Sequence, residues 1–332
     1  MTESRVLFVF LDGVGIGTED PAVNPFLRAR MPVLTSLLGG SLPVLGRNGE
    51  TTMTTARHPD STSRTDPVVV TQWDSRFVGI ATPLDATLDM EGTPQSGTGQ
   101  AALLTGESTA VSYGRHFGPW TPVRLRPLVE EQSVLRRARD AGRSVAFANA
   151  YPRGWPGPRG SRRIAGPPLA ARGAGVLDRH EEALGSGDAV SSEIVNDGWQ
   201  RHLGHDWLPD ITPHEAGTNL ARLAAGYELT LYAHYNTDTA GHRGLMAGAV
   251  EALERVDDFL GGVLASLPRD VVLLIASDHG NIEDVRVGHT RNPALGVIAR
   301  ARGQVDPQAD EALPRDLREV TPYILRTLSV AE

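Results

Sequence analysis

Three short apolar runs, each leading toward acidic or histidine side chains, constrain the fold of this chain most. The runs span residues 5–11, 229–234 and 271–276, and each has the length of one strand. Runs that are apolar at nearly every position are typical of parallel strands covered on both faces. Helical patterns lie between these runs, at about residues 32–38, 100–104, 212–225 and 245–267. The sequence therefore predicts an α/β fold with three layers, in which a mostly parallel sheet has helices on both faces.

The middle of the chain differs in composition from the two ends. Residues 115–179 contain 13 Arg and only four acidic residues, although the whole chain has a formal net charge of -8. We therefore expect a discontinuous core, residues 1–108 and 214–332, with residues 109–213 inserted as a smaller Arg-rich cap. Within this cap, a helical pattern at 128–141 precedes a strand pattern at 144–148. Guanidinium groups bind phosphate or carboxylate in a bidentate fork, so the cap is interpreted as a lid that meets an anion; a solvated surface is the alternative.

The residue types that are missing restrict the chemistry. The chain has no cysteine, and a count finds no lysine, so all 32 basic residues are arginine. Thiolate nucleophiles, cysteine-type zinc sites, Schiff bases and the phosphate-loop lysine are therefore excluded. Catalysis by this chain must use hydroxyl, imidazole or carboxylate groups, or metal ions.

Charge and hydropathy suggest the surroundings of the protein. The net negative charge argues against a general nucleic-acid binder. No apolar run approaches 18 residues, and the first residues do not form a basic region followed by a long apolar stretch. We expect a soluble, cytoplasmic protein that binds neither nucleic acid nor membrane; its oligomeric state is left open.

Three aspartates follow the apolar runs. Asp12 follows the first run directly, Asp238 comes four residues after the second, and Asp278 closely follows the third. The carboxyl ends of parallel strands meet at one edge of a sheet, which is where ligands gather in α/β folds. The three aspartates, although far apart in the sequence, are therefore expected to converge on one site.

Three histidines accompany these aspartates. His242 lies four residues after Asp238, His279 adjoins Asp278, and His289 follows ten residues later. A lone histidine is more often a structural residue than a metal ligand. The prediction of metal ligands therefore rests on the combination of aspartates, histidines and glycine turns in three places. Three Asp and three His supply enough ligands for two divalent ions; mixed ligation suits Mn²⁺ or Zn²⁺, and Mg²⁺ is a weaker candidate because it prefers oxygen. Paired ions stabilise both the attacking and the leaving oxygen of phosphoryl transfer.

A serine before a helical pattern is the candidate nucleophile. Ser96 lies in a Gly-rich segment, residues 92–106, just before the helix expected near Gln100. Backbone N–H groups at a helix start favour an alkoxide or a covalent phosphate. The alternative is a helix N-cap, a role that suits both Ser96 and Thr98.

The order of these motifs resembles the alkaline phosphatase superfamily, and in particular its branch with cofactor-independent phosphoglycerate mutase and phosphopentomutase. The motifs that carry the resemblance are residues 10–17, 94–100, 236–242, 277–281 and 288–290. The resemblance covers both ends of the chain, about two thirds of it, and leaves out the Arg-rich middle.

The resemblance implies a role for each candidate residue. One metal ion would be held by four of them: Asp12, Ser96, Asp278 and His279. The second would be held by Asp238, His242 and His289. Ser96 would also accept the phosphate transiently. Two features depart from the mutases: Gln100 stands where they usually have a histidine, and the inserted segment is much shorter, nearer the size of the phosphopentomutase cap.

The leading hypothesis is a two-metal phosphotransfer enzyme, a phosphomutase or phosphatase, that acts on a small phosphorylated metabolite through a phosphoserine. A phosphodiesterase, sulfatase or phosphonate hydrolase on the same core is the alternative, although Ser96 lacks the sequence context of a formylglycine sulfatase. A third interpretation is a non-catalytic, metal-stabilised binding protein.

Overall fold

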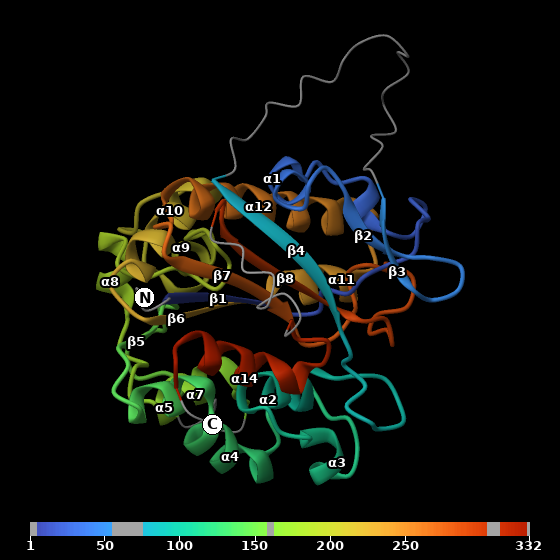
Figure 1. Ribbon diagram of the computed structural model, residues 1–332. Helices are drawn as coiled ribbons and strands as arrows, with labels where there is room; N and C mark the ends of the chain where they lie inside the picture. Colours follow the sequence, from blue (N-terminus) through green and yellow to red (C-terminus); the bar gives the residue numbers. More distant parts are fainter. Residues whose placement is uncertain (1–4, 55–75, 158–162, 304–312, 331–332) are drawn as a thin grey trace.

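A six-stranded sheet forms the centre of the protein, for which the computed structural model describes residues 5–54, 76–157, 163–303 and 313–330 (Figure 1). The strands lie in the order β4-β8-β7-β1-β6-β5. Their bounds are β1 Arg5–Leu11, β4 Phe77–Leu84, β5 Val145–Phe147, β6 Leu229–His234, β7 Val271–Ser277 and β8 Ala294–Ala301. Pairing is parallel from β7 to β5, and β8 runs antiparallel to both of its neighbours. The predicted mostly parallel sheet is confirmed.

Helices cover both faces of this sheet, as the sequence predicts (Figure 1). One face carries α1 Pro32–Leu37, α10 Pro213–Ala224 and α12 Met246–Ser266. The other carries α2 Ser96–Thr105, α4 Arg126–Gln132, α5 Val134–Asp140, α7 Gly166–Gly173 and α14 Leu317–Thr327. Smaller elements are the hairpin of β2 Leu42–Leu45 and β3 Thr51–Thr54, and helix α3 Thr109–Tyr113. None of the described helices is long and apolar enough to cross a membrane.

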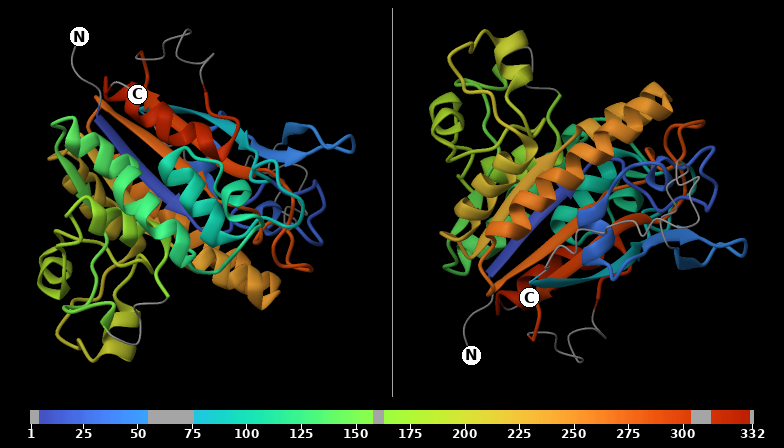
Figure 2. Two further views of the ribbon diagram at one scale, coloured as in Figure 1. Left: turned by 90° about the horizontal axis from the view of Figure 1, so that it is seen from below. Right: turned by 90° about the horizontal axis from the view of Figure 1, so that it is seen from above.

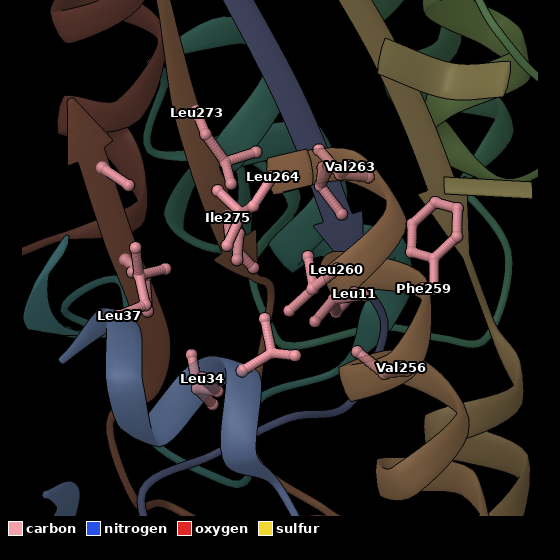
Figure 3. Close-up of a cluster of buried hydrophobic side chains, with 14 of the residues drawn as sticks. Leu11, Leu34, Leu37, Val256, Phe259, Leu260, Val263, Leu264, Leu273 and Ile275 are labelled. Carbon is pink, nitrogen blue, oxygen red and sulfur yellow. The ribbon is translucent and has the colours of Figure 1, made fainter. Parts of the chain in front are cut away.

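Strand β1 shows why its run is apolar at every position after Arg5. Its alternate residues Leu7, Val9 and Leu11 are buried in the apolar cluster beneath α1, α10 and α12, part of which Figure 3 shows. Val6 and Phe8 enter the cluster on the opposite face. Full burial of each such side chain contributes about 2 kcal/mol, so both helix layers are held to the sheet by the same strand.

The predicted helices are found with small changes at their ends. Helix α10 begins where a capping box forms: Thr212 Oγ1 accepts from the Glu215 N–H at 3.2 Å, and the Glu215 carboxylate accepts from the Thr212 N–H at 2.8 Å. The single helix expected over 128–141 is instead two helices, α4 and α5. The chain breaks at Ser133, which has an extended backbone and caps α5 through its side chain.

Much of the expected cap is part of the core, which differs from the predicted division at residues 109 and 213. Strand β5 pairs with β6 in the central sheet, and α4, α5 and α7 supply buried side chains to the second cluster. The short apolar strand and these helices are buried only by joining the main sheet. Residues 178–212, called the cap segment below, hold α8 Glu181–Ser186 and α9 Asp197–Leu203 and lie to one side (Figure 2).

Some of the arginines of the basic segment form ion pairs, several of them with acids outside residues 115–179. Arg153 pairs with Glu182 at 2.6 Å, and Arg143 pairs with Glu228 at 2.8 Å. A third pair, between Arg172 and Glu130, also measures 2.6 Å and joins α7 to α4. The pairs of Arg143 and Arg172 join separate elements, whereas the pair of Arg153 is exposed on both sides and contributes little to stability. The paired arginines are less available to meet a substrate.

Candidate metal centre

The strand order brings the three aspartates together. Strands β7, β1 and β6 are neighbours, and their carboxyl ends lie at one edge of the sheet. Asp12 follows β1 and Asp278 follows β7, while Asp238 lies on helix α11 Asn236–Arg243, just after β6. The Thr237 hydroxyl donates to the Asp12 carbonyl at 2.6 Å, which holds the start of α11 against the end of β1.

The first group of candidate ligands is completely enclosed. Asp12, Asp278 and His279 each place one ligand atom within 4.8 Å of the others, and their exposed fractions are 7%, 0% and 0%. Nε2 of His279 lies 3.4 Å from Oδ1 of Asp12 and 3.6 Å from Oδ2 of Asp278. These two carboxylate oxygens have no hydrogen-bond partner. Buried anionic oxygens without donors are costly, so the donor set fits a cation.

The second group is more open. Asp238, His279 and His289 also meet within 4.8 Å, so His279 lies between the two groups. His242 Nε2 lies 3.3 Å from Oδ2 of Asp238 and 3.0 Å from His289 Nε2. Two ring nitrogens so close can share a proton, or both can direct lone pairs at one cation. These residues therefore also fit a divalent ion.

Ser96 lies at the edge of the first group. It is the first residue of α2, which begins four residues before the predicted position, and its Oγ lies 2.9 Å from His279 Nε2. It does not act as an N-cap, since Gln95 occupies that position without a side-chain hydrogen bond. The Thr98 hydroxyl is engaged elsewhere: it accepts from the Phe117 N–H at 3.2 Å.

Gln100, noted in the sequence only as a departure from the mutases, contacts the site directly. Its Nε2 donates to Oδ2 of Asp12 at 3.1 Å, and its Oε1 accepts from the Gly166 N–H at 2.9 Å. Gln100 therefore orients one candidate ligand and links it to the start of α7.

Burial and the charges of their neighbours strongly shift the pKa values of the candidate ligands. Burial, reinforced by the charge of Asp278, raises the pKa of Asp12 well above its usual range. Burial by itself lowers the pKa of His279, but Asp278 and Asp12 outweigh it and raise this pKa to about 10. Burial raises the pKa of Asp238, but the hydrogen bond from His289 and the charge of His279 outweigh it and lower this pKa to about 2. Without metal, His279 therefore carries a proton where a cation would bind.

Glu283 is a supporting residue that the sequence reasoning missed. Its buried carboxylate accepts from the N–H groups of Gly15 at 3.0 Å and Asn281 at 2.7 Å. A Cβ on Gly15 would lie 2.4 Å from the carboxyl carbon of Glu283, so this contact requires glycine. The sequence feature that could have identified Glu283 is its position: it lies five residues after Asp278, in the same turn as the candidate ligands Asp278 and His279. Asn281 also donates to Oδ1 of Asp238 at 2.6 Å.

Comparison with known proteins matches the second half of the chain to a metalloenzyme family. Residues 214–332 match the Metalloenzyme superfamily. Among curated proteins, the chain is similar to the 2,3-bisphosphoglycerate-independent phosphoglycerate mutases of Rhodopseudomonas palustris (29% identity) and Cellvibrio japonicus (35% identity). Each match covers 39% of this chain and 26% of the relative, so the chain spans about a quarter of the length of these relatives.

Solved structures show the same fold at low sequence identity. The PH0037 protein from Pyrococcus horikoshii has a TM-score of 0.55 at 12% identity, covering 100% of this chain and 98% of that one. The phosphonate monoester hydrolase from Silicibacter pomeroyi has a TM-score of 0.50 at 12% identity, covering 99% of this chain and 74% of that one. These likenesses concern the arrangement of the strands and helices.

Proposed function

Because the chain is a member of the alkaline phosphatase superfamily of metalloenzymes, we propose that it is a two-metal phosphotransfer enzyme that acts through a phosphoserine at Ser96. The substrate class is a small phosphorylated metabolite. A single observation carries the proposal: the Ser96 hydroxyl lies 2.9 Å from His279, a residue common to both groups of candidate ligands.

The resemblance implies that the residues would divide between two ions. The first would be held by Asp12, Ser96, Asp278 and His279, and the second by Asp238, His242 and His289. When bound, such ions neutralise the charge that develops on the transferring phosphoryl group and favour the ionised form of the serine hydroxyl. The remaining parts of the mechanism belong to the chain itself.

The start of α2 is suited to bind the phosphoryl group. The N–H groups of Thr98 and Gly99 donate to the carbonyls of Phe117 and Gln95, at 3.0 and 2.9 Å. The first N–H groups of α2, those of Ser96 and Gly97, have no such backbone acceptor among the described residues. They are free to donate to phosphoryl oxygens beside the Ser96 hydroxyl, where the helix dipole favours negative charge.

The reaction then has two steps. Ser96 gives up its hydroxyl proton and Oγ attacks phosphorus, the ester bond between phosphorus and the substrate oxygen breaks, and the departing oxygen takes a proton. In the second step a hydroxyl of the same molecule (in a mutase) or water (in a phosphatase) loses its proton and attacks the phosphoserine. The bond between phosphorus and Ser96 Oγ then breaks, and Oγ takes a proton, which restores the serine hydroxyl. The mutase relatives support the first outcome, and the fold shared with the phosphonate monoester hydrolase is compatible with a hydrolase.

A screen of phosphorylated metabolites against protein loaded with Mn²⁺ or Zn²⁺ tests the proposal. Products are scored separately as free phosphate and as isomerised ester, with p-nitrophenyl phosphate as a general substrate. We expect turnover that requires metal and is abolished in Ser96→Ala, and a phosphate that peptide mapping locates on Ser96. Thr98→Ser, two residues along the same helix, is the matched control and should keep the label on Ser96.

Three results would contradict parts of the proposal. Full activity in Ser96→Ala, or phosphate on Thr98, would exclude Ser96 as the nucleophile. Metal that binds only substoichiometrically would remove the two-ion centre. Two tightly bound ions without turnover of any phosphate ester would favour the non-catalytic, metal-stabilised binding protein.

A further inference from the structure

A polar cavity of about 490 Å³ lies between the cap segment and helices α11 and α12. Glu193 and His202 line it from the cap segment, and Arg243 and Arg255 line it from the two helices. Cavities that bind small molecules have volumes of roughly 300–1,000 Å³ and occur preferentially between structural units. Its size and place are therefore those of a ligand site.

Helix α11 separates this cavity from the metal centre. The candidate metal ligands Asp238 and His242 lie one turn apart on one side of the helix. The cavity is lined by Thr239, Ala240 and Arg243 of the same helix. At about 100° per residue, the two sets point in directions that differ by about 130°. The cavity therefore does not belong to the site proposed for phosphotransfer.

The charges around the cavity leave one cation and one anion without partners. Arg255 forms an ion pair with Glu251 at 3.2 Å, so these two lining residues neutralise each other. Across the described residues, the guanidinium of Arg243 and the carboxylate of Glu193 form no ion pair or side-chain hydrogen bond. They come from α11 and the cap segment, and no ion pair joins them across the cavity. A ligand that carries both a carboxylate and an ammonium group would complement both.

The remaining lining combines neutral polar groups with small apolar side chains such as Ala240 and Ala252, which also suits a small ligand. Asn236 and Thr239 offer amide and hydroxyl groups. His234 lines the cavity at the end of β6; its Nδ1 lies 2.8 Å from the Ser192 carbonyl, and its Nε2 has no partner. Since a carbonyl only accepts, Nδ1 carries the hydrogen and Nε2 is a hydrogen-bond acceptor. Nε2 of His234 is itself buried, so the polar groups that a ligand can reach are the Asn236 amide, the Thr239 hydroxyl and the two unpaired charges.

We propose that this cavity binds a free amino acid, with its carboxylate at Arg243 and its ammonium group at Glu193. The proposal rests on the cavity and its unpaired charges, and it does not depend on the phosphotransfer function. A ligand that carries both charged groups contacts Arg243 and Glu193 at once, whereas an ion that carries one of them contacts only one of these side chains.

Calorimetric titration of the metal-loaded, full-length protein with L-serine tests the proposal. Propionate carries only the carboxylate and ethylamine only the ammonium group, so each should bind at least about tenfold more weakly than serine. Arg243→Gln and Glu193→Gln should each weaken serine binding by about tenfold or more. Arg269→Gln changes an exposed arginine just before β7, at the opposite edge of the sheet, and should leave the affinity unchanged.

A second pair of measurements keeps the test decisive. Thermal unfolding of each variant shows whether it folds, and the charge-swapped double variant Arg243→Glu with Glu193→Arg should recover most of the affinity lost in the single variants. Serine binding that is equal in wild type, Arg243→Gln and Glu193→Gln would place serine elsewhere, for example at the metal centre, and would overturn the proposal. Failure of serine to bind the folded wild-type protein would overturn it as well. Neither result would affect the proposed role of Ser96.

Discussion

The Glu283 carboxylate accepts a hydrogen bond from the Thr290 hydroxyl at 2.5 Å, which ties the loop that carries His289 to the turn that carries Asp278 and His279. Because Glu283 also accepts from the N–H of Gly15, just after Asp12, one buried side chain connects three of the segments that supply candidate ligands. The precise spacing of the metal centre therefore depends on a residue that is not itself among the candidate ligands.

Removal of the Glu283 carboxylate should loosen the centre. Glu283→Ala leaves the buried N–H groups of Gly15 and Asn281 without an acceptor, which should cost about 3 kcal/mol or more of stability. Metal affinity should fall by about 10–100-fold because the supporting contacts orient the ligands. Urea denaturation and metal titration measure the two effects. Glu131→Ala, on the exposed side of α4, is the control, and an equal loss in both variants would show that Glu283 has no special role.

Metal binding should release protons and should strengthen as the pH rises. In the metal-free protein the pKa of His279 is raised to about 10, so its ring is protonated near neutral pH and must lose a proton to bind an ion. Below that pKa, the affinity of the first ion should rise about tenfold per pH unit. Calorimetry in buffers of different ionisation enthalpy counts the released protons. An affinity that stays constant from about pH 6 to pH 8 would contradict the proton competition at His279.

The close packing of α10 on α12 should depend on glycine. A Cβ on Gly262 would lie 1.9 Å from the His214 carbonyl, and a Cβ on Gly217 would lie 2.0 Å from the Phe259 carbonyl. Gly262→Ala should therefore destabilise the protein by about 1–3 kcal/mol or more. Gly248 lies in the same helix with nothing within 4 Å of its Cβ position, so Gly248→Ala should stabilise by about 0.5–1 kcal/mol. Denaturant unfolding that shows the same sign for both substitutions would contradict this packing argument.

Acid should destabilise the protein through His234. Burial lowers the pKa of His234 to about 4, below its usual 6.5, so the unfolded chain takes up the proton first as the pH falls. The folded state should lose about 3 kcal/mol from this group between pH 7 and pH 4. His234→Gln keeps a donor for the Ser192 carbonyl and does not titrate. If the stability difference between wild type and this variant did not change over that range, the histidine would not be buried as described.

Asp257 should stabilise the folded protein on acidification, in contrast to His234. Burial raises its pKa to about 6 from its usual 3.8, despite its hydrogen bonds to the N–H groups of Val33 and Leu34. The folded protein therefore binds the proton first, and this group should add about 3 kcal/mol of stability as the pH falls through 6 to below 4. Relative to Asp257→Asn, the wild type should gain stability on acidification. A loss over the same window would reverse the sign and exclude the assignment.

The sequence alone determined the class of fold and the general kind of site. Runs that are apolar at nearly every position, such as β1, are typical of strands buried between two helix layers, and the aspartates after them lie close together once the strands are parallel. The same local logic placed α10, whose start is encoded by Thr212 and Glu215 within four residues. Such features are visible in the sequence because they depend on neighbouring residues or on a short periodicity.

Only the tertiary structure decided which distant residues support the site and where the core ends. Glu283 supports the site through hydrogen bonds with Gly15 and Thr290. Gln100 does so through hydrogen bonds with Asp12 and Gly166. These contacts join residues up to 268 positions apart, so they leave no periodic pattern in the sequence. The residues expected to form a separate cap divide between the central sheet and the cap segment, because β5 gains its hydrogen bonds by pairing with β6. The local sequence of β5 predicts a strand, but its partner is a strand more than 80 residues away, and pairing across that separation is set by the packing of the whole chain.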